Sequence, residues 1–375
     1  MNLGIVCTMV NGFGRKGFYN SQEIGLGRAL RKLGNEVTIY KCIMKGETPS
    51  EETIEDGFSI HYIMMPSVGA HAYLDTHVLD KNLDGILCFA DNQWFLPHIY
   101  KFCKNNRIAF VPYIGTTFSF YQNTLRGRVS DLIFKNGTLK LYSKIPVLAK
   151  TEGAIKELNG LGIKSDNITL APVGLDEGLL HTDFEDADKA ELKKELGFEP
   201  DDVVICNVSR LEHEKRPLEL LDIFDRIKDK KKFKLIIVGK GSLVDEVKAK
   251  AERIAPGSVR VLSGVPYNEM WKIYTMSDYY VNMSIYEIFG MAIMEAVYYC
   301  ASVAAITAPG PRITLKDMKG HKICETDEEI EEWLLKDHPD ESVLKASSEK
   351  MLRDFSWRRC AEAFVGIVNS SKAKG

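Results

Sequence analysis

Long apolar runs are missing from this sequence of 375 residues. No stretch approaches the roughly 18 apolar residues that a membrane-spanning helix needs. The first residues, MNLGIVCTMV, lack the basic segment of a signal peptide and are typical of a first strand that leads into a glycine-rich turn. We therefore expect a cytoplasmic protein, which can still touch the inner face of a membrane peripherally.

Paired metal and disulfide motifs are also missing. None of the eight cysteines forms a CxxC pair, and the eight histidines are scattered. Cys7, Cys88 and Cys206 lie in apolar, strand-like runs, where a thiol acts as a small hydrophobe. This distribution argues against a disulfide framework or a zinc site and favours a reducing compartment. Asp186 and Asp188 match a metal-binding DxD pattern, but they lie in a polar linker, so we expect no metal there.

The sequence has no nucleic-acid-binding motif, and its net charge of −3 is unevenly distributed. Residues 1–175 carry a net charge of +4, and residues 101–150 contain nine basic residues and one acid, Asp131. The aromatic residues interleaved there are Phe102, Phe110, Tyr113, Phe118, Phe120, Tyr121, Phe134 and Tyr142. Such a segment predicts peripheral contact with an anionic membrane or an anionic acceptor, although a solvated basic face has the same composition.

Short apolar runs alternate with amphipathic segments, which is typical of α/β units built on parallel sheets. The alternation stops in the acidic stretch 176–188 and then restarts. We therefore expect an N-terminal domain over 1–175, a second domain over 176–355 and a final helix over 356–375 that crosses back. The predicted strands are Leu3–Val10, Glu36–Tyr40, Gly85–Phe89, Ile108–Tyr113, Pro146–Ala149, Ile168–Ala171, Val203–Val208, Lys234–Val238, Val259–Leu262, Tyr279–Met283 and Ser302–Ile306. The main predicted helices are Ser21–Leu33, Glu152–Leu161, Pro217–Lys228, Ser242–Ile254, Asn268–Met276 and Gly290–Cys300.

The loop SRLEHEKRPLELL carries two cations between a strand and a helix. In open parallel sheets, ligands bind beyond the carboxyl ends of the strands. Arg210 and Lys215 precede a helix expected to begin at Pro217, and the amides at a helix start attract anions. The pattern predicts a clamp for a diphosphate. Salt bridges to Glu212 and Glu214 are the alternative.

Two glycine-rich loops follow other strands. VGKGSL contains Gly241, and NGFGRKGFYNS contains Gly12, Gly14 and Gly17, which match GxGxxG. The dinucleotide fingerprint also needs an acid near the end of the second strand, but that strand ends in VTIYK. We interpret the first loop as a turn near a phosphate or sugar, and an NAD-dependent oxidoreductase remains the alternative.

The run YEIFGMAIMEA contains two carboxylates, Glu287 and Glu295, eight residues apart. On a helix, eight residues are close to two turns and span roughly 12 Å. Two such carboxylates can line one cleft and accept hydrogen bonds from a ribose and from a sugar. Two solvated helix glutamates would have the same spacing, so spacing alone leaves both interpretations open.

Taken in order along the chain, these pieces resemble the retaining GT-B glycosyltransferases called group 1 or family 4. The matching segments are the glycine-rich first loop, SRLEHEKRP, KLIIVGKGSL, VRVLSGVPYNEMWKIYTMSDYYVNMS, EIFGMAIMEA and the closing FSW. The resemblance implies two Rossmann-like, doubly wound parallel-sheet domains that face each other across a cleft. It also implies that the second domain binds most of a nucleotide-sugar donor.

The resemblance further implies roles for individual residues. Arg210 and Lys215 would neutralise the leaving diphosphate, Glu287 would contact the transferred sugar, and Glu295 would hold the ribose. The other donor contacts would come from Gly14, Gly241, Val265, Phe289, Gly290 and Met291. Because preplaced cations stabilise the leaving group, neither a metal nor another cofactor is expected.

One departure from the family lies in FVPYIGTTFSFY, where many members have a histidine and this chain has none. Gly115 and Thr116 are our candidates for the acceptor side. The predicted activity is transfer of a hexose, from a UDP-sugar rather than a GDP-sugar, to a glycan, lipid-linked or other cell-surface acceptor. The alternatives are a sugar-nucleotide epimerase of the same fold and a non-catalytic protein that binds sugar nucleotides.

Overall fold

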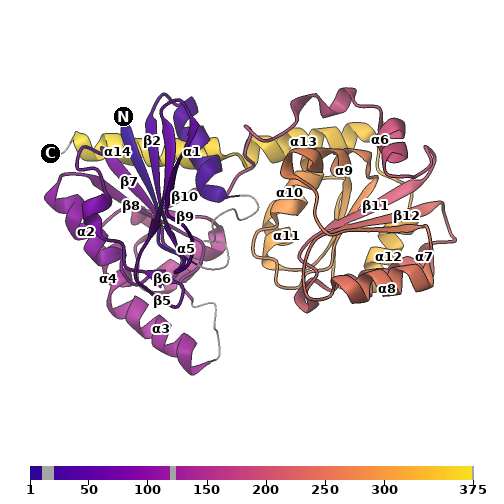
Figure 1. Cartoon of the computed structure of the whole chain (residues 1–375), viewed down its shortest axis with the longest axis horizontal. Coiled ribbons are helices and arrows are strands. Elements are labelled where there is room, and N and C mark those ends of the chain that lie inside the picture. The colour runs from indigo at the N-terminus through magenta and orange to yellow at the C-terminus, as the bar shows by residue number, and fades with distance from the viewer. Residues whose placement is uncertain (11–20, 119–123, 374–375) are drawn as a thin grey trace. The chain divides into compact units, whose positions relative to one another are not determined.

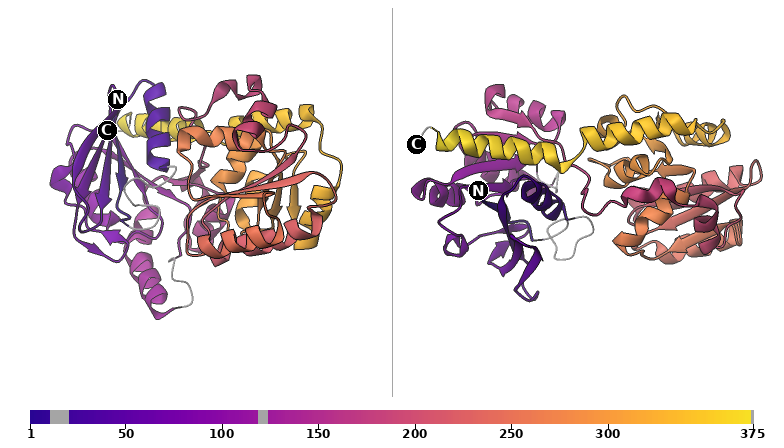
Figure 2. Two further views of the ribbon diagram at one scale, coloured as in Figure 1. Left: turned by 45° about the vertical axis from the view of Figure 1, so that its right-hand side comes forward. Right: turned by 90° about the horizontal axis from the view of Figure 1, so that it is seen from above.

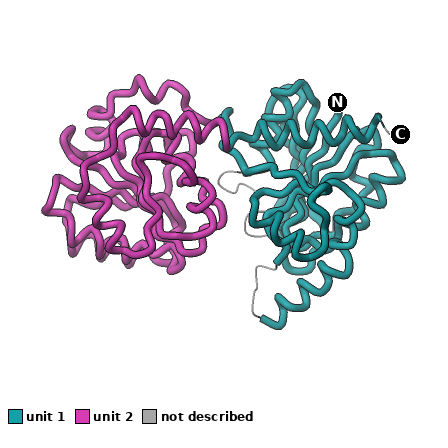
Figure 3. The backbone as a smooth tube through the Cα atoms, turned by 180° about the vertical axis from the view of Figure 1, so that it is seen from behind, with its two compact units in different colours: residues 1–178, 355–375 teal, residues 179–354 magenta. Residues whose placement is uncertain are grey.

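The computed structural model describes residues 1–10, 21–118 and 124–373, and the chain divides into two compact α/β units (Figures 1 and 3). Unit 1 comprises residues 1–178 and 355–375, and unit 2 comprises residues 179–354. Within the described residues, no helix has the length and apolar character needed to span a bilayer.

Unit 1 is built on an eight-stranded sheet in the order β10-β9-β8-β7-β1-β2-β4-β3. Neighbouring strands are parallel except for the β3–β4 pair. Its strands are β1 (Asn2–Cys7), β2 (Glu36–Ile43), β3 (Ser50–Glu55), β4 (Phe58–Met64), β7 (Gly85–Phe89), β8 (Ala109–Ile114), β9 (Val147–Ala149) and β10 (Ile168–Leu170). The strand order runs outward from the centre in both directions, so β1 and β7 flank the point where the order reverses.

The helices of unit 1 cover this sheet (Figures 1 and 2). They are α1 (Gln22–Lys32), α2 (Leu96–Asn105), α3 (Leu125–Asn136), α4 (Thr138–Tyr142), α5 (Glu152–Gly160) and α14 (Trp357–Lys372). A short hairpin, β5 (Ser67–Val68) and β6 (His71–Ala72), forms a two-stranded sheet, and His71 bridges to Met9 just after β1.

The aromatic surface expected over residues 101–150 is wrong for four of its members. Phe110, Tyr113, Phe134 and Tyr142 are at most 5% exposed and belong to the core. Their rings face inward because they lie on strands and on the inner faces of helices, whereas Phe118 is 40% exposed.

Unit 2 has a six-stranded, wholly parallel sheet in the order β13-β12-β11-β14-β15-β16. Its strands are β11 (Val203–Val208), β12 (Phe233–Val238), β13 (Val259–Leu262), β14 (Tyr279–Asn282), β15 (Ser302–Ile306) and β16 (Lys322–Cys324). Its helices are α6 (Lys189–Glu195), α7 (Pro217–Ile227), α8 (Val244–Ile254), α9 (Met270–Met276), α10 (Met291–Tyr298), α11 (Pro309–Thr314), α12 (Asp327–Leu335) and α13 (Glu341–Asp354). This is the doubly wound order 3-2-1-4-5-6, whose reversal lies between β11 and β14.

The two stretches of chain that enter and leave unit 2 lie side by side on unit 1. The Leu175 amide donates to the Phe355 carbonyl oxygen over 2.7 Å, and Leu175 pairs with Ser356 as an isolated parallel bridge. The next residue, Trp357, is 2% exposed and packs on α1. Gly25 makes room for its indole, since a Cβ there would lie 2.5 Å from Nε1.

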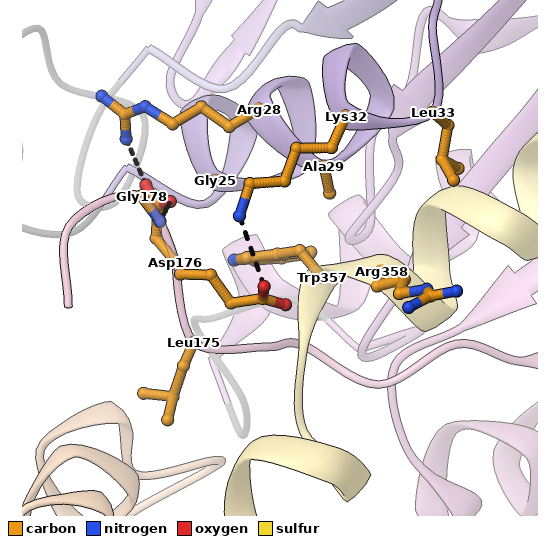
Figure 4. A pocket seen from close by; sticks show the side chains of 11 residues that line it. Gly25, Arg28, Ala29, Lys32, Leu33, Leu175, Asp176, Gly178, Trp357 and Arg358 are labelled. Carbon is orange, nitrogen blue, oxygen red and sulfur yellow. Dashed lines mark hydrogen bonds and ion pairs between the residues drawn. The ribbon is translucent and has the colours of Figure 1, made fainter. Parts of the chain in front are cut away.

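Ion pairs from α1 hold the same crossing (Figure 4). Arg28 pairs with Asp176, and Lys32 pairs with Glu177 over 3.3 Å. These side chains and Trp357 line a pocket of about 270 Å³ within unit 1. Residues 175–177 are therefore fixed to unit 1 by backbone pairing and by charge.

Candidate functional site

The charged residues expected to meet the diphosphate and the sugar lie beyond the carboxyl ends of two neighbouring strands of unit 2. β11 and β14 pair directly, with Ile205 opposite Tyr279 and Cys206 opposite Tyr280. Because these strands flank the reversal of strand order, the loops that follow them diverge and leave room for a ligand. One loop carries Arg210 and Lys215, and the other carries Glu287.

Lys215 joins the two loops. Its Nζ donates to Glu287 Oε2 over 2.8 Å and to Ser284 Oγ over 3.2 Å. The Lys215 and Glu287 side chains are 15% and 19% exposed, respectively. Ser284 is fixed in turn, because its amide donates to Asn282 Oδ1 over 3.0 Å. The ammonium group of Lys215 is therefore held in a defined position at the strand ends, largely shielded from solvent.

The backbone beside Lys215 is held by its neighbour. Arg216 adopts a left-handed conformation with φ 51° and directly precedes α7 at Pro217. Its guanidinium makes a two-pronged contact with Asp327 of α12, with bonds of 3.0 and 2.7 Å. Bidentate pairs of this kind constrain direction as well as distance. Arg216 thereby fixes the turn that presents Lys215.

Arg210 occupies the more open end of the same loop. Its side chain is 63% exposed and pairs with Glu214 over 2.7 Å. The salt bridge considered from the sequence is therefore present. Exposed pairs of this kind are weak, so Arg210 can exchange Glu214 for another anion at small cost.

The loop containing Gly241 packs tightly against the loop after β11. A Cβ on Gly241 would lie 2.2 Å from the Leu211 carbonyl oxygen, and one on Gly239 would lie 1.8 Å from that of Ser209. The Ser242 hydroxyl donates to Glu212 over 2.5 Å, and this bond holds the pKa of the Glu212 carboxyl below its usual value. Both glycines are thus explained by close backbone packing, whether or not Gly241 also meets a donor.

Phe289, Gly290 and Met291 form the entry to α10. Gly290 has φ 88°, a conformation that favours glycine, and α10 begins at Met291. The Gly310 amide donates to the Glu287 carbonyl oxygen over 2.7 Å and fixes this loop against α11. The first amides of a helix have no acceptor within the helix, so this turn offers donors to an anion.

Glu295 is buried inside unit 2, with 1% of its surface exposed. Its carboxylate accepts hydrogen bonds from Tyr274 Oη over 2.8 Å and from Tyr267 Oη over 3.2 Å. Tyr267 follows Val265, a predicted donor contact, in the loop after β13, so its hydrogen bond brings this loop beside the glutamate expected to hold the ribose. In the structure, both of these hydrogen bonds to the Glu295 carboxylate come from tyrosine hydroxyls.

In unit 1, Gly115 and Thr116 directly follow β8. Their amides donate to Asp91, which also accepts from Lys150 Nζ over 2.5 Å. Asp91 follows β7, at the reversal point of the sheet of unit 1. Gly14 lies outside the described residues.

Three residues that contact candidate site residues were not predicted from the sequence. Asp91 is a single acid after a strand, and a lone acid carries no recognisable spacing. Tyr274 lies in an apolar helical pattern that looks like core, and Ser284 lies in an apparently ordinary strand end. The signal for all three is their place beyond the carboxyl ends of strands or next to a predicted site residue.

The larger part of unit 2 matches a known protein family. Residues 188–350 match the family described as Glycosyl transferases group 1. This segment is therefore similar to the group 1 glycosyltransferases. All described unit 2 residues of the candidate site, from Arg210 to Glu295, lie within it, as the resemblance read from the sequence predicted.

The chain is also similar to a curated protein, a D-inositol 3-phosphate glycosyltransferase of Segniliparus rotundus. The two are 28% identical over 156 residues, which cover 40% of this chain and 34% of that protein. The chain therefore matches about a third of the length of this relative.

Solved structures match the whole chain. A glycosyltransferase of Rickettsia africae has a TM-score of 0.73 at 16% identity, covering 100% of this chain and 99% of that one. HepE of Anabaena, solved in complex with UDP, has a TM-score of 0.72 at 15% identity, covering 98% and 99%. At these identities the likeness shows the fold alone, and the predicted GT-B fold is confirmed.

Proposed function

We propose that this protein is a glycosyltransferase that moves a hexose from a nucleotide diphosphate sugar to a hydroxyl acceptor. The observation that carries this proposal is the Lys215–Glu287 pair at the strand reversal of unit 2, within the segment that matches the group 1 family. Of the two nucleotides considered, we favour a UDP-sugar. HepE, which shares the fold, was solved with UDP.

The reaction breaks the bond between the anomeric carbon and the diphosphate oxygen. Negative charge then grows on the leaving diphosphate and positive charge on the sugar ring. Lys215 and Arg210 supply two cations for the negative charge on the diphosphate. The Glu287 carboxylate can accept hydrogen bonds from the sugar's hydroxyls. Cations fixed before the reaction stabilise such a transition state without reorganising. They supply the charge for which many enzymes use a divalent metal, so we propose that the reaction is independent of metal.

The acceptor oxygen forms the new bond to the anomeric carbon, and its proton passes to the departing phosphate. This front-face course retains the anomeric configuration and needs no protein base. A course without a protein base agrees with the surroundings of Gly115 and Thr116. Asp91, the acid bonded to their amides, also accepts from Lys150, so its carboxylate is already engaged. We propose a glycan or lipid-linked acceptor.

Calorimetric titration tests the proposal. UDP, GDP, ADP and NADH would each be added without metal to the wild type and to Glu295→Ala. We expect one diphosphate, UDP, to bind the wild type tightly and the variant at least tenfold more weakly. Turnover of the matching nucleotide sugar should be unchanged by EDTA.

Other outcomes would contradict separate parts of the proposal. Binding of NADH with no response to any diphosphate would revive the oxidoreductase alternative. Tight binding of GDP would change the assigned nucleobase from uracil to guanine and leave the proposed reaction unchanged. Conversion of the sugar nucleotide without an acceptor would indicate an epimerase.

A further inference from the structure

Helix α3 presents an apolar face to solvent. Leu125, Val129, Leu132 and Ile133 are 80%, 48%, 61% and 40% exposed. At about 100° of rotation per residue, these four side chains fall within one sector of roughly 100°. Another exposed apolar group in the described chain, Ile285, Tyr286 and Ile288, lies in the loop that carries Glu287 and belongs to the candidate site, whereas α3 lies outside that site. A continuous exposed stripe of this kind marks an interaction site rather than chance exposure.

The opposite face of α3 is anchored to unit 1. Gly127, Ser130 and Phe134 are buried, and Ser130 Oγ donates to Asn92 over 2.7 Å and accepts from Trp94 Nε1 over 3.0 Å. The helix therefore cannot rotate to hide its apolar stripe. In Figures 1 and 3, α3 projects from the body of unit 1.

Basic side chains border the stripe on both sides. By the same rotation, Arg126 lies on one edge, and Arg128 and Lys135 lie on the other. Lys140 and Lys144 follow directly and are also exposed. The acid of this segment, Asp131, lies toward the anchored face, where it accepts from Asn92 over 3.1 Å. An apolar stripe between basic edges is the pattern of a helix that lies in a membrane interface.

We propose that α3 docks unit 1 on an anionic membrane surface. Its aliphatic side chains would enter the boundary between headgroups and acyl chains, and Arg128, Lys135, Lys140 and Lys144 would meet acidic headgroups. The complementarity of charge favours an anionic lipid surface over a second copy of this chain. Two copies packed through α3 would place the basic residues of one helix against those of the other, and like charges repel.

This inference deepens the proposed function by delivering the enzyme to a lipid-linked acceptor, and it rests on that function only for the nature of the acceptor. Docking is measured without turnover. A failure of membrane binding and a failure of sugar transfer are therefore separate results.

Vesicle co-sedimentation of the full chain tests the proposal. The vesicles contain phosphatidylcholine alone or phosphatidylcholine and phosphatidylglycerol in equal parts. We expect retention on the anionic vesicles, weak retention on the neutral ones, and loss at high salt. Leu132→Asp should lower the affinity about tenfold or more, since a leucine that would enter the membrane is replaced by a charge. Leu335→Asp, an exposed leucine of α12, should leave it unchanged.

A second set of variants tests the attraction between the basic residues and the acidic headgroups. Arg128→Glu combined with Lys135→Glu should lower affinity by at least roughly fivefold for each position. Lys248→Glu, on the exposed face of α8, is the control. The proposal is overturned if the wild type does not sediment with anionic vesicles at low salt, or if Leu132→Asp binds them equally well. It is also overturned if sedimentation velocity shows a dimer that Leu132→Asp dissociates, because the stripe would then be covered by a second copy.

Discussion

Lys215 donates a hydrogen bond to Glu287 over 2.8 Å and thereby ties together two loops that lie 72 residues apart in the chain. The contact places the ammonium group between a carboxylate and the buried Ser284 hydroxyl. In the proposed reaction the two charges have separate partners, the ammonium group for the donor's diphosphate and the carboxylate for its sugar.

Lys215→Ala should lower kcat by about 10²–10³, the usual loss when one preorganised donor is removed. Steady-state kinetics with the preferred nucleotide sugar checks this. Lys215→Arg should recover part of the rate, and Lys248→Ala should have no effect. Wild-type turnover in Lys215→Ala would remove this residue from the mechanism.

Arg210→Ala should also lower kcat, because the second cation beside the leaving diphosphate is lost. Glu214→Ala is the informative partner variant. It frees Arg210 from its ion pair, so nucleotide affinity should stay the same or rise. If Arg210 were only a partner of Glu214, both variants would behave alike and neither would alter kinetics.

Glu295→Gln should weaken UDP binding by at least about tenfold, since a neutral amide is a poorer acceptor for paired hydroxyls. Tyr274→Phe removes the shorter of the two tyrosine bonds and leaves the carboxylate in place. It should bind UDP nearly as well as the wild type. Calorimetry distinguishes the two, and circular dichroism shows whether either variant is misfolded.

Gly239→Ala should destabilise unit 2 by about 1–3 kcal/mol or more, because the new methyl group would meet the fixed Ser209 carbonyl at 1.8 Å. Gly366→Ala is the matched control, since nothing lies within 4 Å of its added Cβ in α14. It should stabilise by roughly 0.5–1 kcal/mol. Urea denaturation of both variants measures the difference, and equal midpoints would refute the packing argument.

Unit 2 should lose stability as the pH falls below 6.5. Burial lowers the pKa of His321 to about 4, and its Nδ1 accepts the Val303 amide over 3.0 Å. Between the two pKa values the unfolded chain binds a proton and the folded chain does not, so unfolding is favoured by acid. At pH 5 this amounts to about 2 kcal/mol. His321→Gln should flatten the pH dependence of the unfolding free energy over this range, and an unaltered slope would exclude His321 as its source.

The sequence predicted all eleven of the strands named from apolar runs, because a buried parallel strand has a compact apolar signature. It missed β4, although FSIHYIM alternates buried and partly exposed residues, and β3, whose SEETIE sequence is largely exposed. It also missed the short strands β5, β6 and β16, which have two or three residues each. A solvent-facing strand and a very short one have too few apolar residues to stand out.

The candidate site residues could be chosen from the sequence one by one, but their contacts could not. Lys215 and Glu287 could each be chosen from their loops, yet their pairing depends on β11 lying next to β14, and no local pattern encodes strand order. The burial of Glu295 under Tyr274 likewise depends on how α9 packs beside α10. Asp91 required the fold of unit 1 before its role in holding Gly115 became visible.

The pairing of Leu175 with Ser356 makes unit 2 an insertion within the chain of unit 1. Unit 2 is one continuous segment, so during synthesis all of it leaves the ribosome before residues 355–372 do. Trp357 and Phe364 are 2% and 0% exposed in unit 1, which cannot close its core without them. The half of the protein that is translated first is therefore the half that finishes folding last, and until then the surface that α14 covers is open to chaperones.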